Sequence, residues 1–403
     1  HSTVPFDKIK TGDYVPAIRE GIRRQNAEIE AIIRNPEVPT FANTVLAYEK
    51  SGEMLHRVST VFGNLLSAET DDDLQELAKE IMPMMSEHEN NISLNEELFA
   101  RIKAVYKQQD KETLSPEQHK LLEDIYNGFV RNGANLLGED KEKYRALCKE
   151  LSLLTLQFSE NNLKETNDYK LVITDKSQLA GLPESAVEAA AETAGEKGVE
   201  GWVFTLQAPS YGPFLTYADS RDLRRELYMA YNTKCTHDNA SNNLEIVKKL
   251  ANVRMEIAQL LGYDNFAEYN LQERMAQNSE SVYKLLDQLL EAYTPTAKQE
   301  YAEVQALARQ AEGEDFVLMP WDWAYYSHKL KDRKFNIDDE LLRPYFELNN
   351  VKQGVFGLAT RLYGITFKKN PDIPVYHKDV DAYEVFDKDG KFLAVFYTDF
   401  HPR

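Results

Sequence analysis

Apolar residues recur at helical spacing along most of this sequence, and this periodicity is the strongest constraint on its fold. From Tyr14 to about Tyr363, hydrophobic side chains stand three and four residues apart in long segments that short turns separate. An α-helix brings such residues onto one face, whereas a strand requires alternation. The sequence therefore predicts a mainly α protein with long helices at roughly 14–33, 42–67, 72–108, 138–166, 213–235, 241–261 and 350–363.

Two segments carry sharper helix signals. Ser115 is followed by Pro116 and, two residues later, by Gln118, a combination that predicts a capping box and a helix start. Farther along the chain, six apolar residues repeat at helical spacing, and we interpret them as a helix face buried in the core. These residues are Val282, Leu285, Leu286, Leu289, Leu290 and Tyr293.

Two regions depart from the helical pattern. Residues 170–174 and 202–206 are short β-type runs on either side of an Ala-rich helix, so a small β element is predicted near 170–206. At the end of the sequence, Ala382–Phe386 and Phe392–Tyr397 flank a turn-rich segment and predict a β-hairpin. Its second strand is apolar on both faces, and we expect it to be covered on both sides.

The length of 403 residues exceeds the size at which one hydrophobic core stops growing, so two or more lobes are expected. We predict an N-terminal helical lobe over residues 1–167. Residues 168–403 are predicted to form the first part of a second domain, which is helical and ends in the β-hairpin at 382–400. Lys368–Pro374 is the segment most similar to a linker.

Composition excludes several classes of protein. The 66 acidic and 47 basic residues give a formal net charge of -19, which argues against a nucleic-acid partner because phosphate binding needs clustered Lys and Arg. No run approaches the roughly 18 to 20 apolar residues that a membrane-spanning helix needs, so no membrane partner is predicted. Cys148 and Cys235 are too far apart for a metal or redox motif and are interpreted as free or buried thiols. His1 opens the sequence without a signal-peptide pattern.

Zinc hydrolysis on a helix requires two His four residues apart and a Glu beside the first. The eight His residues of this sequence are widely separated, and the closest pair, His377 and His401, is 24 residues apart. His88-Glu89 begins the motif, but Ile92 stands where its second His is needed, so we interpret it as a surface helix pair. His377 with Asp379 and Asp381 is interpreted as a solvated loop, with loose ion binding as the alternative.

Aromatic and Pro residues gather in four blocks of the last third, which we interpret as core anchors or, alternatively, as the wall of a cleft. The blocks are Pro320–Tyr326, Leu342–Phe346, Pro374–His377 and Phe396–His401.

These blocks, with others earlier in the chain, resemble the thimet-oligopeptidase-like zinc metallopeptidases. The likeness runs over essentially the whole chain and is strongest to the peptidyl-dipeptidase (dipeptidyl carboxypeptidase) branch, with oligopeptidase A as a near relative. The choice of branch depends on the Tyr-x-Asp-Phe pattern at Tyr397–Phe400. The other matching segments are Pro39–Phe41 with Asn43-Thr44, Leu261–Tyr263, Asn265–Tyr269, Pro320–Ala324, Arg343–Phe346 and Ile373–His377.

The resemblance implies a long-helix, two-lobed metallopeptidase scaffold around a deep, narrow cleft that admits short unstructured peptides. In this family an H-E-x-x-H helix and a further downstream Glu hold zinc, the motif Glu activates water, and later tyrosines stabilise the oxyanion. None of these segments is present in this sequence. We therefore expect the catalytic zinc subdomain to be missing, with no catalytic residue and no zinc in this chain.

The resemblance then implies the N-terminal, non-catalytic part of a zinc-dependent peptidyl-dipeptidase that releases C-terminal dipeptides from oligopeptides. The expected partners are short unstructured peptides and the missing C-terminal catalytic portion. The substrate-cleft candidates are Tyr397, Asp399, Phe400 and His401, whereas Trp321, Trp323 and Tyr326 are interpreted as scaffold.

Alternatives remain open. Three other hypotheses are a stand-alone helical peptide-binding or interaction module, part of an oligopeptidase A-like endopeptidase, and a carboxylate-based hydrolase unrelated to zinc. A fragment is expected to expose an apolar surface and to self-associate through its C-terminal hairpin. The thiols and the resemblance favour the cytoplasm, with the periplasm as the alternative.

Overall fold

Long amphipathic helices form most of the structure, as the periodicity predicts. The computed structural model describes residues 3–108, 113–336 and 339–401, so His1 and Arg403 lie outside the described residues. The helices are α1 (Tyr14–Ile33), α2 (Leu46–Glu49), α3 (Glu53–Ala68), α4 (Asp72–Ser93), α5 (Glu96–Lys107), α6 (Pro116–Arg131), α7 (Gly138–Asp168), α8 (Glu184–Glu196), α9 (Ala208–Tyr217), α10 (Arg221–Asn232), α11 (Leu244–Leu260), α12 (Phe266–Leu271), α13 (Ser279–Glu312), α14 (Trp323–Phe335), α15 (Asp339–Leu342) and α16 (Leu348–Tyr363).

Single residues decide where the predicted helices begin and divide. The predicted segment 42–67 is interrupted at Gly52, whose φ of 75° lies in the left-handed region that glycine tolerates. The segment 72–108 divides because the Asn95 side chain accepts a hydrogen bond from the Leu98 N–H and so starts a new helix, α5. The capping box of Ser115 and Gln118 at the start of α6 is confirmed.

Two small antiparallel sheets accompany the helices. β1 (Leu171–Ile173) pairs with β2 (Trp202–Phe204), which confirms the predicted β element. The predicted hairpin is formed by β4 (Asp381–Phe386) and β5 (Phe392–Thr398), and β3 (Thr366–Lys369) adds a third strand in the order β3-β4-β5. The sequence did not predict β3, because its only large apolar residue is Phe367 and part of it was assigned to the linker. Phe367 stacks on Phe356 of α16 at 4.2 Å between ring centroids.

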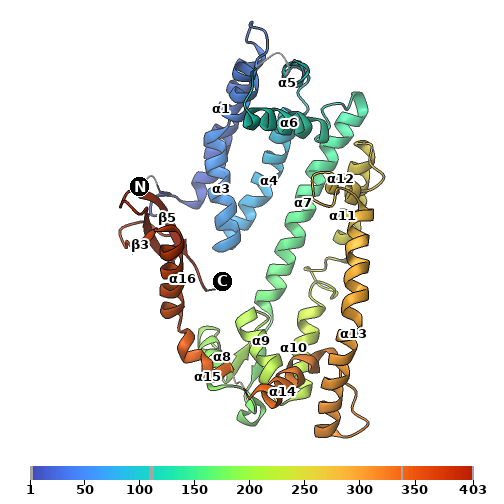
Figure 1. Cartoon of the computed structure of the whole chain (residues 1–403), viewed down its shortest axis with the longest axis vertical. Coiled ribbons are helices and arrows are strands. Elements are labelled where there is room, and N and C mark those ends of the chain that lie inside the picture. Colours follow the sequence, from blue (N-terminus) through green and yellow to red (C-terminus); the bar gives the residue numbers. More distant parts are fainter. Residues whose placement is uncertain (1–2, 109–112, 337–338, 402–403) are drawn as a thin grey trace.

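Several separate hydrophobic clusters hold the helices together. Figure 1 shows α1 and α3–α6 at one end of the molecule and α8–α10 with α14 at the other, with α7 and α13 running between these ends. Ile18 and Phe62 are buried in the cluster of the N-terminal helices. Leu154 of α7 and Leu250 of α11 belong to a second cluster, and Phe214 packs under the β1–β2 sheet in a third. Among the described helices, none combines the length and the hydrophobicity that crossing a membrane requires.

The predicted core stripe between Val282 and Tyr293 is not buried, so that prediction is wrong: Val282 and Leu289 are half-buried, and the other four residues are exposed. Leu286 is 51% exposed, Leu290 67% and Tyr293 65%. The buried residues of α13 lie nearer its C-terminal end, where Val304 and Ala308 share a hydrophobic cluster with residues of α14. Within the described part of the chain, α14 covers the C-terminal half of α13 and leaves the N-terminal half open.

The hairpin strand β5 is likewise less covered than its sequence predicts. Phe392, Leu393 and Phe396 are exposed, and β5 is an edge strand of its sheet. The expected cover on both sides is therefore not supplied by the described residues.

The close packing of the small sheet leads to a first prediction. Gly201 has φ 101°, and a Cβ there would lie 2.3 Å from the Ile173 carbonyl oxygen. We expect Gly201→Ala to lower the free energy of unfolding by about 1–3 kcal/mol, because the strand pair must shift or the backbone must strain. Urea unfolding at constant m-value measures the change.

The matched control is Gly195→Ala in α8, where nothing lies within 4 Å of a new Cβ. That substitution is expected to raise stability by roughly 0.5–1 kcal/mol, because alanine loses less backbone entropy in a helix. Equal effects of the two substitutions would contradict the interpretation.

Candidate functional site

The end of β5, where the cleft candidates lie, is attached to the N-terminal segment. The ring of Tyr397 meets that of Phe6 edge to face at 6.3 Å, and Phe6 contacts Tyr376 in the same way at 5.5 Å. The Tyr376 hydroxyl donates a hydrogen bond of 2.7 Å to Asp399 Oδ2. Burial raises the pKa of the Tyr397 phenol. Tyr397 and Asp399 therefore have packing and positioning tasks at this end of the strand.

The other two cleft candidates point outward. Phe400 is 51% exposed, and His401 is exposed as well. The structure thus brings the four candidates to one end of β5. Asp399, Phe400 and His401 are exposed there, whereas Tyr397 is half-buried.

A cavity of about 1640 Å³ lies elsewhere, among α1–α4 and α7, and none of the cleft candidates lines it. His88 is one of its lining residues and is buried, with its Nε2 2.7 Å from Gln25 Oε1, so its interpretation as a surface residue is wrong. The ring reaches across to α1 because the two helices pack together at this point. Burial raises the pKa of the Glu89 carboxyl and of the Cys148 thiol in the same cavity.

Neither cysteine has the low pKa that a nucleophile needs. Both Cys148 and Cys235 are free, as predicted. Burial, reinforced by the neighbouring Glu165, raises the pKa of the Cys235 thiol to about 11. Thiols with raised pKa values remain protonated at neutral pH and are poor nucleophiles.

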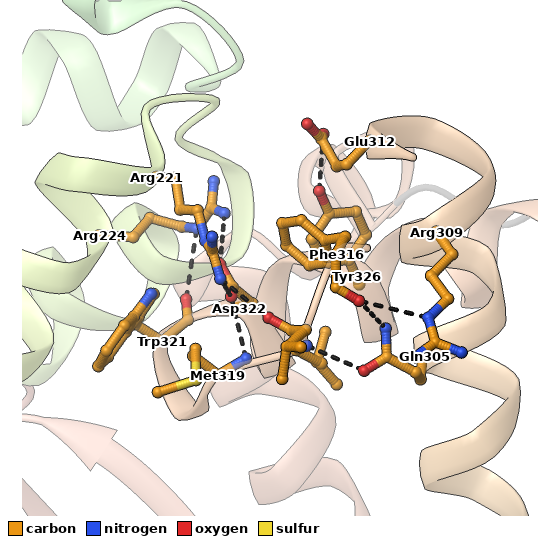
Figure 2. Close-up of polar contacts among 12 residues, drawn as sticks. Arg221, Arg224, Gln305, Arg309, Glu312, Phe316, Met319, Trp321, Asp322 and Tyr326 are labelled. Atoms are coloured by element: carbon orange, nitrogen blue, oxygen red, sulfur yellow. Dashed lines mark hydrogen bonds and ion pairs between the residues drawn. The ribbon is translucent and has the colours of Figure 1, made fainter. Parts of the chain in front are cut away.

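A polar network is centred on Asp322 in the 3-10 turn Pro320–Asp322, at the start of α14 (Figure 2). Asp322 is 0% exposed, and Arg224 of α10 is 1% exposed. Arg224 Nη2 donates to Asp322 Oδ1 at 3.0 Å, and Arg221 Nη2 donates to Oδ2 at 2.7 Å. The Met319 N–H adds a bond of 3.0 Å to Oδ2. One buried carboxylate therefore joins α10 to the loop that precedes α14.

Arg224 also satisfies backbone carbonyls. Its Nη1 donates to Ala218 O at 2.7 Å and to Asp219 O at 3.1 Å, and its Nε donates to Trp321 O at 3.3 Å. The guanidinium lies 4.1 Å from the centroid of the Tyr325 ring. A buried charge is tolerated when it is paired and its remaining donors are bonded, and Arg224 meets both conditions.

Further bonds extend the network to α13. Gln305 Nε2 donates to Phe316 O at 2.9 Å, and the Leu318 N–H donates to Gln305 Oε1 at 2.9 Å. The Tyr326 hydroxyl donates to Glu312 at 2.8 Å (Figure 2). Burial, and then this bond, raises the pKa of the Tyr326 phenol. The C-terminal half of α13 is thus fixed to α14 and, through Asp322, to α10.

Local sequence explains how the charged groups meet. The Ser220 side chain accepts a hydrogen bond from the Leu223 N–H and starts α10, so Arg221 and Arg224, three residues apart, share one helix face. Tyr326, which the sequence predicts to be scaffold, is buried, whereas Trp323 is exposed and stacks on Tyr301. The arginines were not predicted as part of a site, although the sequence shows two basic residues on one face directly after a helix cap. The charged groups of the network are hydrogen-bonded to one another and to backbone groups. The network therefore has a structural role, which is to hold α10, α13 and α14 together.

The described residues do not fit a catalytic zinc ion. Within the described ranges, no group of three or more His, Cys, Asp or Glu residues is placed to hold a metal. Asp381 binds Lys369 at 2.6 Å and Lys352 at 3.2 Å, while His377 and Asp379 form a pair of their own at 3.6 Å. The three residues considered for loose ion binding are therefore divided between two separate clusters.

Comparison with known proteins confirms the resemblance derived from the sequence blocks. Residues 214–403 match the peptidase family M3. The chain is 39% identical to the dipeptidyl carboxypeptidase of Escherichia coli (strain K12), in an alignment that covers 100% of this chain and 60% of that protein. It is 32% identical to oligopeptidase A of the same organism, over 99% of this chain and 59% of the relative.

A more distant relative, the thimet-like oligopeptidase of Dictyostelium discoideum, is 25% identical over 97% of this chain and 59% of its own length. The chain thus resembles metallopeptidases of this family along its whole length, and it spans about 60% of the length of the curated relatives it matches. The Asp322 network lies inside the region that matches the family.

The network gives a second prediction. We expect Asp322→Ala to lower the free energy of unfolding by about 3–5 kcal/mol, because it leaves the buried Arg224 without its counter-charge. Asp322→Asn retains one acceptor oxygen and is expected to cost less. Urea unfolding followed by far-UV circular dichroism measures both changes.

Asp315→Ala is the control. This carboxylate, on the loop before α14, is exposed, so the change in the free energy of unfolding is expected to stay within about 0.5 kcal/mol. A loss below 1 kcal/mol for Asp322→Ala would contradict the central role of the carboxylate.

Proposed function

We propose that this chain is the N-terminal, non-catalytic part of a zinc-dependent peptidyl-dipeptidase, whose complete form releases C-terminal dipeptides from oligopeptides. The observation that carries the proposal is the match of residues 214–403 to peptidase family M3, within alignments that cover the whole chain. The higher identity to the dipeptidyl carboxypeptidase, 39% against 32% for oligopeptidase A, favours the peptidyl-dipeptidase branch.

In this proposal the chain supplies scaffold, and zinc and its ligands belong to the catalytic portion. Zinc there would activate the attacking water; the residues of this chain would shape the path by which peptides enter. We place Phe400 and His401 on that path, because their side chains are accessible at the end of β5. Tyr397 and Asp399 would hold that end in place through Phe6 and Tyr376. We keep the two-lobed division at residues 167 and 168, which coincides with the end of α7 at Asp168.

The proposed partners are short unstructured peptides and the catalytic portion. Without that portion, the exposed Phe392, Leu393 and Phe396 of the hairpin favour association between copies of the chain. We propose a cytoplasmic location, with the periplasm as the alternative.

The chain alone is expected to be inactive, which is a third prediction. Purified protein of verified mass should release no dipeptide from an oligopeptide substrate and should bind much less than one zinc per chain, because it lacks the H-E-x-x-H ligands. Mass spectrometry of the products and metal analysis provide the measurements. One tightly bound zinc per chain, or dipeptide release that a chelator abolishes, would contradict this prediction.

A fourth prediction tests the activity of the complete enzyme. A chimera is made in which this chain is followed by the part of the Escherichia coli dipeptidyl carboxypeptidase that lies outside the alignment. We expect chelator-sensitive release of dipeptides from the C-terminus of an oligopeptide. Cleavage at internal bonds would assign the chain to the oligopeptidase A type. A folded but inactive chimera, together with a reading frame that stops after codon 403, would favour the stand-alone binding module.

A further inference from the structure

Two helices carry an apolar face that the described chain leaves open. On α13 this face, here called the α13 stripe, consists of Leu286, Leu290 and Tyr293, which are 51–67% exposed. Val304 lies eighteen residues after Leu286, which is five full turns at 3.6 residues per turn, so it lies on the same side of the helix. Val304 is buried against the α14 region. One continuous face is therefore covered in its C-terminal half and uncovered in its N-terminal half.

The second open face is on α16. Phe356 is buried and packs on Phe367 of β3 and on Tyr383 of β4, which accounts for the side of α16 that faces the sheet. A second stripe, here called the α16 stripe, runs along the opposite side of the helix and is 39–64% exposed; its residues are Val351, Val355, Leu358 and Leu362. A helix that is apolar on two opposite sides is one that is buried from both sides.

We propose that both stripes are docking faces for the polypeptide that completes the family M3 enzyme, an inference that rests on the proposed function and adds where its partner binds. The relatives are longer than this chain by about 40% of their own length, which is enough polypeptide to contact separate faces. Both stripes lie inside residues 214–403, the region matched to that family.

A second copy of this chain is a poorer occupant. The α13 stripe extends over eight residues, about 12 Å of helix at 1.5 Å per residue. Stable protein interfaces bury about 800 Å² per partner, and one helix pair of this length provides far less. The α16 stripe lies on another helix, near the hairpin sheet (Figure 1). It would enlarge the interface only if one partner contacted both helices, and the additional polypeptide of the relatives is long enough to do so.

The test uses the chimera described above, with a specific protease site at the junction, folded as one chain and cut after purification. We expect the two parts to stay together in size-exclusion chromatography with light scattering. Leu286→Glu/Leu290→Glu and Leu358→Glu/Leu362→Glu should each weaken their association at least tenfold. Gln288→Glu/Ala302→Glu adds the same charge at exposed positions on the opposite face of α13 and should change it less than twofold. Each substitution is also made in this chain alone, without the second part, and the unfolding midpoint of that protein shows whether the variant is folded.

The outcomes separate the inference from the proposed function. Cut parts that fall apart in the unsubstituted chimera, or stripe variants that associate as tightly as the control, would overturn the docking faces. Dimers of the isolated chain that both stripe variants abolish, in the absence of association with the second part, would assign the stripes to a second copy and overturn the proposal too. A stripe-dependent complex without peptidase activity would support docking and contradict only the proposed function.

Discussion

The buried contact between Asp322 and the guanidinium groups of Arg221 and Arg224 is the interaction on which this part of the structure depends. Both Asp322 and Arg224 are almost fully removed from solvent, so each of these buried charges is stabilised by the other. Since Arg224 also binds the carbonyls of Ala218 and Trp321, the pair fixes backbone as well as side chains. It determines how α10, α13 and α14 meet at the end of the molecule that α7 joins to the N-terminal helices.

The open stripes on α13 and α16 also reflect how the helices of this chain are stabilised. Helices of this length gain most of their stability from burying an apolar face, not from intrinsic propensity. The described chain buries that face where α14 lies on α13, and the sheet buries one side of α16. The remaining stripes have the hydrophobic pattern of core residues, but no part of the described chain covers them. Exposed apolar faces of this kind are typical of interaction surfaces.

Much of the fold was predictable because its signals are local. The boundaries of α1, the cap of α6 and the strands of the hairpin depend on neighbours within a few residues, and these predictions are confirmed. β3 was missed because a four-residue strand with one large apolar residue leaves little periodic signal. The family resemblance was also visible, since it depends on short blocks of residues whose order the sequence displays. The candidate site was less accessible: the aromatic block around Tyr326 was noticed, but its charged partners on α10 lie almost a hundred residues away.

The sequence by itself determined the helices, their amphipathic faces, the residues that start and stop them, and the absence of the H-E-x-x-H pattern. Periodicity reports which side of a helix is apolar, because side-chain spacing is set by the backbone. It does not report whether that side is covered, because cover comes from residues distant in the chain. Tertiary structure alone decided that Val304 is buried while Leu286 on the same face is exposed, that His88 is a buried partner of Gln25, and that Asp322 finds its counter-charge on α10.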